Sequence, residues 1–255
     1  MERPIALITG ATSGIGLSTS IMFASLGYDI IITGRRQERL KDLKSEIENK
    51  YNVRVQHLRF DIRSKEETIN SFSTLSQEWR NIDVLINNAG LASGLEPIQD
   101  GDFEDWDKMI DTNIKGLLYI SRLVTPIMKS RMKGHIVNIG SIAGKQVYPN
   151  GGVYCATKHA VDAISEALRL DLVNYGVKVS QVCPGAVKTE FSNVRFHGDD
   201  ERAEKVYDGF EPLTAEDIAS VIKYIIQLPD HICINDIVVM PKAQASAYIT
   251  HKEMK

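Results

Sequence analysis

The chain has 255 residues, of which 43% are hydrophobic and 25% are charged, and its formal net charge is −3. This length is typical of one large α/β domain, which buries enough apolar surface to fold without a metal or a disulfide. The basic residues are dispersed, which excludes the concentrated basic surface of a nucleic-acid-binding protein. The chain enters a predicted strand almost at once, and no apolar run approaches the ~18 residues of a membrane span, so we expect a cytoplasmic protein without a membrane partner.

The first predicted strand, residues 5–9, leads into the segment T-G-A-T-S-G-I-G over residues 9–16, and a helical pattern then continues to residue 26. Glycine lets a backbone approach a pyrophosphate closely, and the N–H groups at a helix start face negative charge. The spacing G-x-x-x-G-x-G differs from the common G-x-G-x-x-G, and a simple strand–helix turn is the alternative interpretation. We predict a dinucleotide phosphate site that uses Gly10, Ala11, Thr12, Ser13, Gly14, Ile15 and Gly16.

The second predicted strand, residues 28–33, is followed by Gly34, Arg35 and Arg36. A carboxylate at this place would accept hydrogen bonds from the adenosine ribose, whereas arginine suits a 2′-phosphate. The absence of an acid and the presence of two arginines therefore favour NADP(H) over NAD(H). In the alternative interpretation, the arginines merely precede the charged helix over residues 37–50.

The third predicted strand, residues 53–60, ends in Asp61 and Ile62, and the capping-box pattern of Ser64 and Glu67 opens a helix to about residue 79. The fourth, residues 82–86, is followed by N-N-A-G over residues 87–90. These small and amide side chains allow a flat ligand to approach closely, although the motif alone could be a turn. A loop over residues 91–101 precedes a helical region over residues 103–132, in which Asn113 is predicted to be exposed or to mark a local kink.

The fifth predicted strand, residues 135–139, precedes Ser141, and a long helix over residues 153–175 carries Tyr154 and Lys158. Residues four apart share one face of a helix. A lysine cation beside a tyrosine lowers the phenol pKa from about 10. Tyr154 then becomes a candidate general acid/base, with the Ser141 hydroxyl nearby. Taken alone, such a pair is usually an ordinary half-buried aromatic and a surface lysine, and only the rest of the chain favours the catalytic interpretation.

The sixth predicted strand, residues 177–182, is followed by Pro184 and Gly185. Residues 190–212 form a polar, non-sheet insertion of the kind that serves as a substrate lid. A helix to residue 228, a last strand over residues 234–239 and a weakly structured tail, residues 241–255, complete the chain. Strands that alternate with helices predict an α/β fold with a doubly wound parallel sheet, and the motifs that follow its strands should meet at one edge.

The three cysteines, Cys155, Cys183 and Cys233, are far apart and flanked by apolar residues. They favour free thiols in a reducing compartment over disulfides or a zinc site, and no metal site is expected.

The chain resembles the short-chain dehydrogenase/reductase family over nearly its whole length. The resemblance rests on residues 9–16, Asp61, residues 87–90, Asn113, Ser141, Tyr154-x-x-x-Lys158 and Pro184-Gly185 with Thr189. Residues 33–40, 109–113 and 189–196 are similar to the branch of NADP-dependent 3-hydroxy acid (serine or allo-threonine) dehydrogenases. Two departures are a turn over residues 184–189 that is one residue shorter than in that branch, and a last strand without the D-G-G ending common in the wider family.

The resemblance implies a single Rossmann-type domain over residues 1–255, with about seven strands and helices on both faces. It implies that Tyr154 exchanges a proton with the substrate oxygen, that Lys158 lowers its pKa and holds the nicotinamide ribose, and that Ser141 positions the substrate. Asn113 would stabilise a helix bend and a water of the proton relay. Besides the glycine segment, the implied NADP(H) contacts are Arg35, Arg36, Asp61, Ile62, Asn88, Ala89, Gly90, Tyr154, Lys158, Pro184, Gly185, Val187 and Thr189. A homotetramer is the habit of the family.

The resemblance also implies a small 3-hydroxy acid as substrate, of the serine, allo-threonine or 3-hydroxypropionate/malonic semialdehyde type. Its hydroxyl would meet Ser141 and Tyr154, and its carboxylate needs a cation or amide donors. Arg195 is the first candidate, Gln146 and Lys188 are weaker ones, and a solvated Arg195 remains an alternative. The competing functions are a broad-specificity NADPH carbonyl reductase and a non-catalytic NADP(H)-binding sensor, although a sensor would not need the Ser141, Tyr154 and Lys158 set.

Overall fold

The structure is a computed structural model that describes residues 3–253. Within this range, seven parallel strands form one sheet in the order β3-β2-β1-β4-β5-β6-β7. The strands are β1 (Ile5–Ile8), β2 (Asp29–Gly34), β3 (Val55–Arg59), β4 (Ile82–Asn87), β5 (Gly134–Ile139), β6 (Val177–Pro184) and β7 (Asp236–Val239). The strand order reverses between β1 and β4, and a doubly wound sheet opens a ligand crevice at such a point. The predicted Rossmann-type α/β fold is confirmed.

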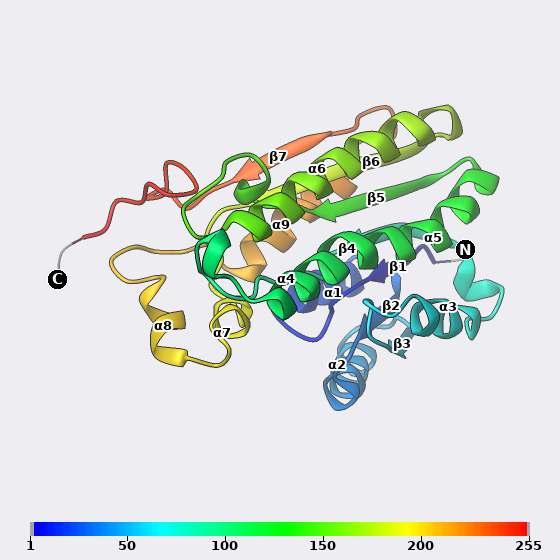
Figure 1. Cartoon of the computed structure of the whole chain (residues 1–255). Coiled ribbons are helices and arrows are strands. Elements are labelled where there is room, and N and C mark those ends of the chain that lie inside the picture. Colours follow the sequence, from blue (N-terminus) through cyan, green and yellow to red (C-terminus); the bar gives the residue numbers. More distant parts are fainter. Residues whose placement is uncertain (1–2, 254–255) are drawn as a thin grey trace.

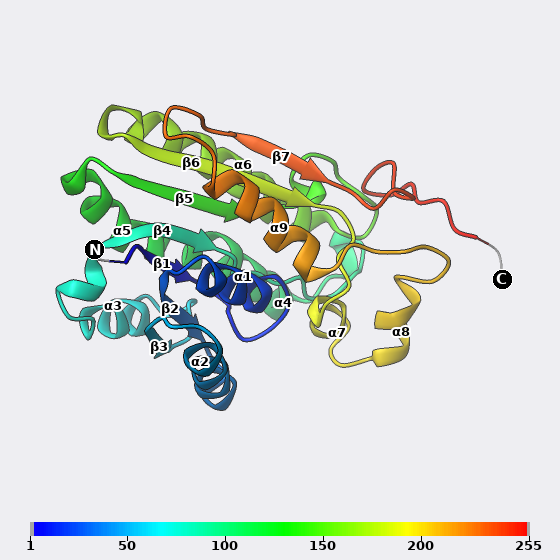
Figure 2. The same cartoon turned by 180° about the vertical axis from the view of Figure 1, so that it is seen from behind.

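Helices cover both faces of this sheet. One face carries α1 (Gly14–Ser25), α2 (Gln37–Lys50) and α9 (Ala215–Ile226), seen from their own side in Figure 2. The other carries α3 (Lys65–Ser73), α4 (Phe103–Ile110), α5 (Leu117–Arg131) and α6 (Gly152–Leu172), with α4 to α6 in front in Figure 1. Within β1, Ala6 and Ile8 enter the core beneath α1 and α9, whereas Ile5 and Leu7 enter the core beneath α5. Burial on both faces explains why the strand is apolar throughout.

Some predicted elements differ from the structure at their ends. The helix predicted to reach residue 79 stops at Ser73, and a separate 3-10 turn then buries Trp79. Ser64 accepts a hydrogen bond from the Glu67 N–H as the capping box requires, but the Glu67 carboxylate turns instead to the N–H of Asp61. This bond ties the start of α3 to the end of β3.

The segment predicted as a lid contains two short helices, α7 (Phe191–Arg195) and α8 (Asp200–Lys205). The tail beyond residue 241 is more ordered than predicted, because Gln244 pairs with Thr250 in an antiparallel bridge and the Gln244 carboxamide oxygen accepts the Ala186 N–H. None of the helices within residues 3–253 combines the length and the apolar character needed to cross a bilayer.

Candidate active site

The carboxyl ends of the strands border one cleft with a cavity of about 320 Å³. Ser141 and most of the predicted cofactor residues line it: Gly10, Thr12, Ser13, Gly14, Ile15, Arg35, Arg36, Asp61, Ile62, Asn88, Ala89, Gly90, Tyr154, Lys158, Pro184, Gly185, Val187 and Thr189. Two predicted residues, Ala11 and Gly16, support this wall from behind. The Ala11 N–H donates to the Thr33 carbonyl, and a Cβ on Gly16 would lie 2.3 Å from the carbonyl oxygen of Gly10.

The glycine loop is held in shape by the segment that follows β4. The Asn88 carboxamide donates to the carbonyl oxygens of Thr9 and Gly10 at 2.9 and 3.1 Å. Gly10 and Gly14 have φ angles of 65° and 51°, in the left-handed region that glycine enters without strain. Helix α1 begins at this loop with no acidic residue in its first turn, so the positive end of its dipole is not offset there. The loop therefore offers close backbone approach and a favourable field for phosphate groups.

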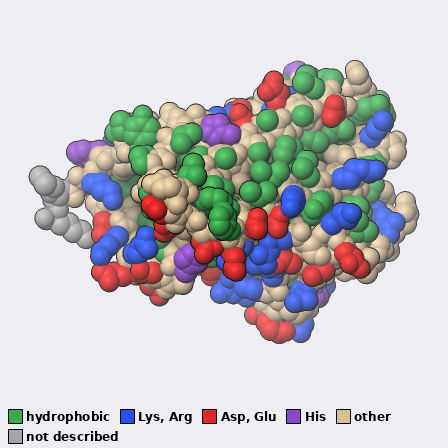
Figure 3. Space-filling view, viewed as in Figure 1, with side chains coloured by type: hydrophobic (Ala, Val, Ile, Leu, Met, Phe, Trp, Pro, Cys, Tyr) green, Lys and Arg blue, Asp and Glu red, His purple; other side chains and the backbone are tan. Residues whose placement is uncertain are grey.

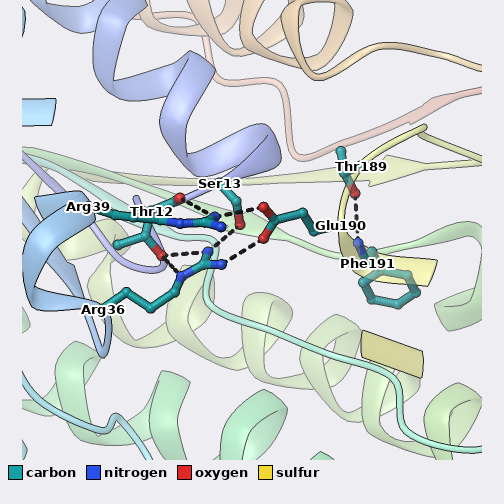
Figure 4. Close-up of polar contacts among 7 residues, drawn as sticks. All are labelled: Thr12, Ser13, Arg36, Arg39, Thr189, Glu190 and Phe191. Atoms are coloured by element: carbon teal, nitrogen blue, oxygen red, sulfur yellow. Dashed lines mark hydrogen bonds and ion pairs between the residues drawn. The ribbon is translucent and has the colours of Figure 1, made fainter. Parts of the chain in front are cut away.

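A polar cluster built on Arg36 lies beside this loop (Figure 4). Arg36 Nε and Nη2 donate to Thr12 Oγ1 at 3.0 and 2.8 Å, and Nη2 also donates to Ser13 Oγ at 2.8 Å. Arg36 Nη1 pairs with one Glu190 oxygen at 2.7 Å, and Arg39 Nη1 pairs with the other at 2.6 Å. The hydrogen bond from Arg36, followed by that from Arg39, holds the pKa of Glu190 below its usual value although burial opposes it. The cluster therefore joins the glycine loop, the start of α2 and the start of the lid segment.

Asp61 places a carboxylate at the end of β3. Burial raises its pKa, but hydrogen bonds from Arg63 and a smaller contribution from Arg35 outweigh that effect and hold the pKa below its usual value. The shortest of these bonds joins Arg63 Nη2 to Asp61 Oδ2 at 2.6 Å. Asp61 is therefore a fixed, ionised acceptor in the cleft wall.

Tyr154 and Lys158 are both buried at the start of α6, and the two residues are 8% and 6% exposed. Lys158 Nζ donates to the Ile139 carbonyl at 2.9 Å, and burial lowers its pKa to about 8. Burial also raises the pKa of Tyr154, with a further rise from Tyr148, while the Ser141 hydroxyl and Arg195 lower it. The pKa of Tyr154 is therefore raised, not lowered as predicted, because its burial outweighs the groups that favour its anion. Lys158 Nζ is bonded to the backbone of β5.

Asn113 lies in a π-helical turn, Asp111–Gly116, between α4 and α5. Its carboxamide donates to the Leu91 carbonyl at 2.8 Å and to Thr157 Oγ1 at 3.0 Å, and its oxygen accepts the Leu91 N–H at 2.8 Å. The Thr157 hydroxyl in turn donates to the Tyr154 carbonyl. Asn113 therefore holds the first turn of α6 against the segment after β4. Of the two predicted alternatives, its side chain is not exposed, and it lies where the helix is locally irregular.

Arg195, at the end of α7, lies beside the active-site cleft and lines a smaller pocket that Tyr154 also borders. Its guanidinium lies 5.4 Å from the ring centre of Tyr148 and 5.7 Å from that of Tyr154, and Nε donates to the Gly94 carbonyl at 3.2 Å. Nη2 is buried and finds no hydrogen-bond partner among residues 3–253. A buried guanidinium nitrogen without a partner is costly, so this donor is suited to an anion that enters beside Tyr154.

The other two carboxylate candidates lie elsewhere. Gln146 is exposed, and its carboxamide oxygen accepts the N–H of Ala247 in the C-terminal tail. Lys188 pairs with Glu204 at 2.7 Å in the lid segment. Neither lines the cleft, and their contact with a substrate stays a prediction.

Several residues of the cleft were not identified from the sequence. Glu190, Phe191 and Val194 line it from the lid segment, and Phe191 meets Tyr154 edge-on with ring centres 5.6 Å apart. The sequence gives only a weak indication that Arg39 lies near the site, because it is three residues after Arg36 and shares its helix face. The segment T-E-F at residues 189–191 is part of the family resemblance and carries no other sequence signal.

Comparison with known proteins agrees with this geometry. The sequence profile described as short chain dehydrogenase matches residues 4–200. A probable NADP-dependent dehydrogenase of Haemophilus influenzae is 48% identical over 97% of each chain. The NADP-dependent 3-hydroxy acid dehydrogenase YdfG of Escherichia coli is 47% identical over 95% of this chain and 97% of that one.

A solved structure, the closed form of serine dehydrogenase complexed with NADP+, superposes with a TM-score of 0.90 at 45% identity. The alignment covers 98% of this chain and 100% of that chain. Since the profile spans most of the chain and the relatives cover nearly all of it, the chain belongs to the short-chain dehydrogenase family.

Proposed function

We propose that this protein is an NADP(H)-dependent oxidoreductase that acts on a small 3-hydroxy acid. The observation that carries the proposal is the buried, unpartnered Arg195 Nη2 within residues 3–253, placed beside Tyr154. A broad carbonyl reductase would not need a desolvated cation next to its proton donor. The relatives named as 3-hydroxy acid and serine dehydrogenases, and the NADP+ in the serine dehydrogenase complex, support the same substrate class and cofactor.

The residues of the cleft fit a 2′-phosphorylated dinucleotide. The glycine loop presents a left-handed Gly10 and Gly14 next to the start of α1, which suits the pyrophosphate. Arg35 and Arg36 follow β2 where a 2′-phosphate would lie, and Asp61 and Lys158 supply polar groups further along the cleft. The nicotinamide, when bound, supplies the hydride chemistry.

The protein's own part in the reaction is to hold the substrate and to move one proton. The Tyr154 hydroxyl is the group that exchanges a proton with the substrate oxygen, and Ser141 orients that oxygen. Because burial raises the Tyr154 pKa, the phenol keeps its proton near neutral pH and is ready to donate it to a carbonyl. For alcohol oxidation the phenol must be deprotonated, and the groups that favour its anion are Ser141 and Arg195.

The substrate carboxylate meets Arg195. A guanidinium grips a carboxylate with two parallel hydrogen bonds, which fixes the direction of the short chain as well as its charge. The hydroxyl of a 3-hydroxy acid then falls near Tyr154, because the guanidinium lies over that ring. Phe191 closes the apolar side of the same space.

The test is a panel of hydroxy acids with NADP+ and NAD+ in parallel, in which one acid is paired with an alcohol that lacks the carboxylate. L-Serine, L-allo-threonine, 3-hydroxyisobutyrate and 3-hydroxypropionate are the acids, and 1,3-propanediol is the partner of the last. We expect oxidation of the acids with NADP+ at a kcat/KM at least about tenfold above the diol, since a charge-assisted pair is worth about 1.5–3 kcal/mol. Faster turnover of the diol, or of neutral aldehydes and ketones, would establish the carbonyl reductase instead. Tight NADPH binding without turnover of any compound would establish the sensor.

We further propose that copies of the chain associate. Figure 3 shows hydrophobic side chains gathered along α5 and α6 on the outer face. Phe103, at the start of α4, and Leu118, on α5, are 76% and 42% exposed, and Leu170 at the far end of α6 is 70% exposed. Apolar patches of this kind mark protein interfaces. Light scattering of the purified protein tests this, and a monomer at micromolar concentration contradicts it.

A further inference from the structure

Glu190 occupies a particular place in the chain. It follows Thr189, which lines the cleft, and it directly precedes α7, which carries Arg195. Its two carboxylate oxygens are divided between Arg36 and Arg39, at 2.7 and 2.6 Å (Figure 4). A carboxylate therefore bridges the guanidinium groups that stand at the end of β2, where a 2′-phosphate is expected.

The donors of Arg36 are nearly all in use. Nε and Nη2 are bonded to the hydroxyls of Thr12 and Ser13, and Nη1 is bonded to Glu190. These bonds use four of its five N–H groups, so a phosphate that takes two hydrogen bonds from this guanidinium must replace a partner that is already there. Glu190 is the anionic partner, and a phosphate and a carboxylate that share one guanidinium lie within a few Å and repel each other.

Replacing Glu190 by a phosphate costs little free energy because these ion pairs lie near the surface. The side chains of Glu190, Arg36 and Arg39 are 45%, 40% and 49% exposed. Ion pairs this exposed contribute little each, whereas a phosphate brings more charge and a third acceptor oxygen to the same donors.

We propose that Glu190 is a cofactor-selectivity residue that competes with the 2′-phosphate for Arg36 and Arg39 and gives way when that phosphate binds. The bridge lowers the affinity for the 2′-phosphate and leaves a dinucleotide without that phosphate unaffected. Release of Glu190 also frees the start of α7 from α2. This inference rests on the proposed NADP(H) site, and not on the identity of the substrate.

The test measures cofactor binding alone. The role of Glu190 can therefore be refuted while oxidation of hydroxy acids is observed, and it can be supported while no oxidation is observed. Isothermal titration of the full chain compares wild type, Glu190→Gln and the control Glu201→Gln. Glu201 lies in the same lid segment and pairs with Lys205 at 2.6 Å. The probes are NADP+ and NAD+, together with adenosine 2′,5′-bisphosphate and adenosine 5′-monophosphate, which differ only in the 2′-phosphate.

Glu190→Gln is expected to lower the Kd of NADP+ and of the bisphosphate by roughly 2- to 10-fold, the range that two exposed ion pairs can supply. The Kd of NAD+ and of the monophosphate should stay within about twofold, and Glu201→Gln should behave as wild type. Weaker binding of the 2′-phosphorylated probes would show that Glu190 stays in place as a clamp and would overturn the proposal. An equal change for all four probes, or no change for any, would overturn it as well.

Discussion

Replacement of Arg195 tests the link between the lid segment and the substrate. Arg195→Met keeps much of the packing of the aliphatic stem against Tyr148 and Tyr154 and removes the guanidinium that faces both rings. The lost charge-assisted hydrogen bonds to a carboxylate are worth about 1.5–3 kcal/mol, or a ~10- to 150-fold loss of kcat/KM for 3-hydroxypropionate. Arg195→Lys keeps the charge without the planar fork, so its loss should be smaller.

The same replacement has a second effect, which the assay separates from the first. Arg195 lowers the pKa of Tyr154, so its removal should move the limb of the oxidation profile that rises with pH to higher pH for every substrate. The assay is NADPH formation from 3-hydroxypropionate and from 1,3-propanediol, each across pH, so the ratio of the two reports the carboxylate contact. The control is Arg202→Met, which removes an arginine of the same segment that stacks on Phe196. Equal losses for acid and diol would refute the carboxylate contact and leave Arg195 with an effect on Tyr154 alone.

Three further predictions concern the proton donor, the buried histidine and Asn113. Tyr154→Phe should lower kcat by about 10²- to 10⁴-fold while NADPH titration gives an unchanged Kd, and a retained kcat would contradict the role of the phenol. Burial lowers the pKa of His135 from 6.5 to about 4, so the unfolded chain binds a proton here at a higher pH than the folded chain does. The stability that is present above pH 6.5 is therefore lost as the pH falls toward 4. The free energy of unfolding should fall by about 3 kcal/mol over this range, and by less in His135→Gln, as measured by urea unfolding at each pH. An equal fall in the variant would contradict the role of His135. Asn113→Ala should cost about 1–3 kcal/mol, because the Leu91 N–H and carbonyl lose their partner, and thermal unfolding unchanged from wild type would show that another group replaces it.

The parts of the fold that follow from local patterns were predictable. Apolar runs such as residues 5–8 are buried on both faces, and the glycines at positions 10 and 14 adopt the left-handed backbone that a tight loop requires. The motifs after each strand meet at one edge because parallel strands place their carboxyl ends together. For that reason nearly all of the predicted cofactor residues line the cleft.

Contacts that depend on how distant segments pack could not be predicted in this way. Arg36 and Glu190 are 154 residues apart, and no periodicity signals that the lid segment reaches α2. Periodicity also indicates that a residue is buried without identifying its partners. The sequence suggested Lys158 as the cation that lowers the pKa of Tyr154, whereas Arg195 has that effect in the structure. The bond between Gln146 and Ala247 could not be predicted for a similar reason, since the two residues lie 101 positions apart in the chain.

The most direct test of the proposed reaction follows the hydrogen on the carbon that bears the hydroxyl. Wild-type protein is incubated with NADP+ and L-serine deuterated at C3, and the reduced cofactor is analysed by mass spectrometry, with Tyr154→Phe in parallel. The proposed function predicts one deuterium in the NADPH formed by the wild type and at least about 100-fold less product from the variant. Reduced cofactor without deuterium, or equal deuterium transfer by Tyr154→Phe, would contradict it.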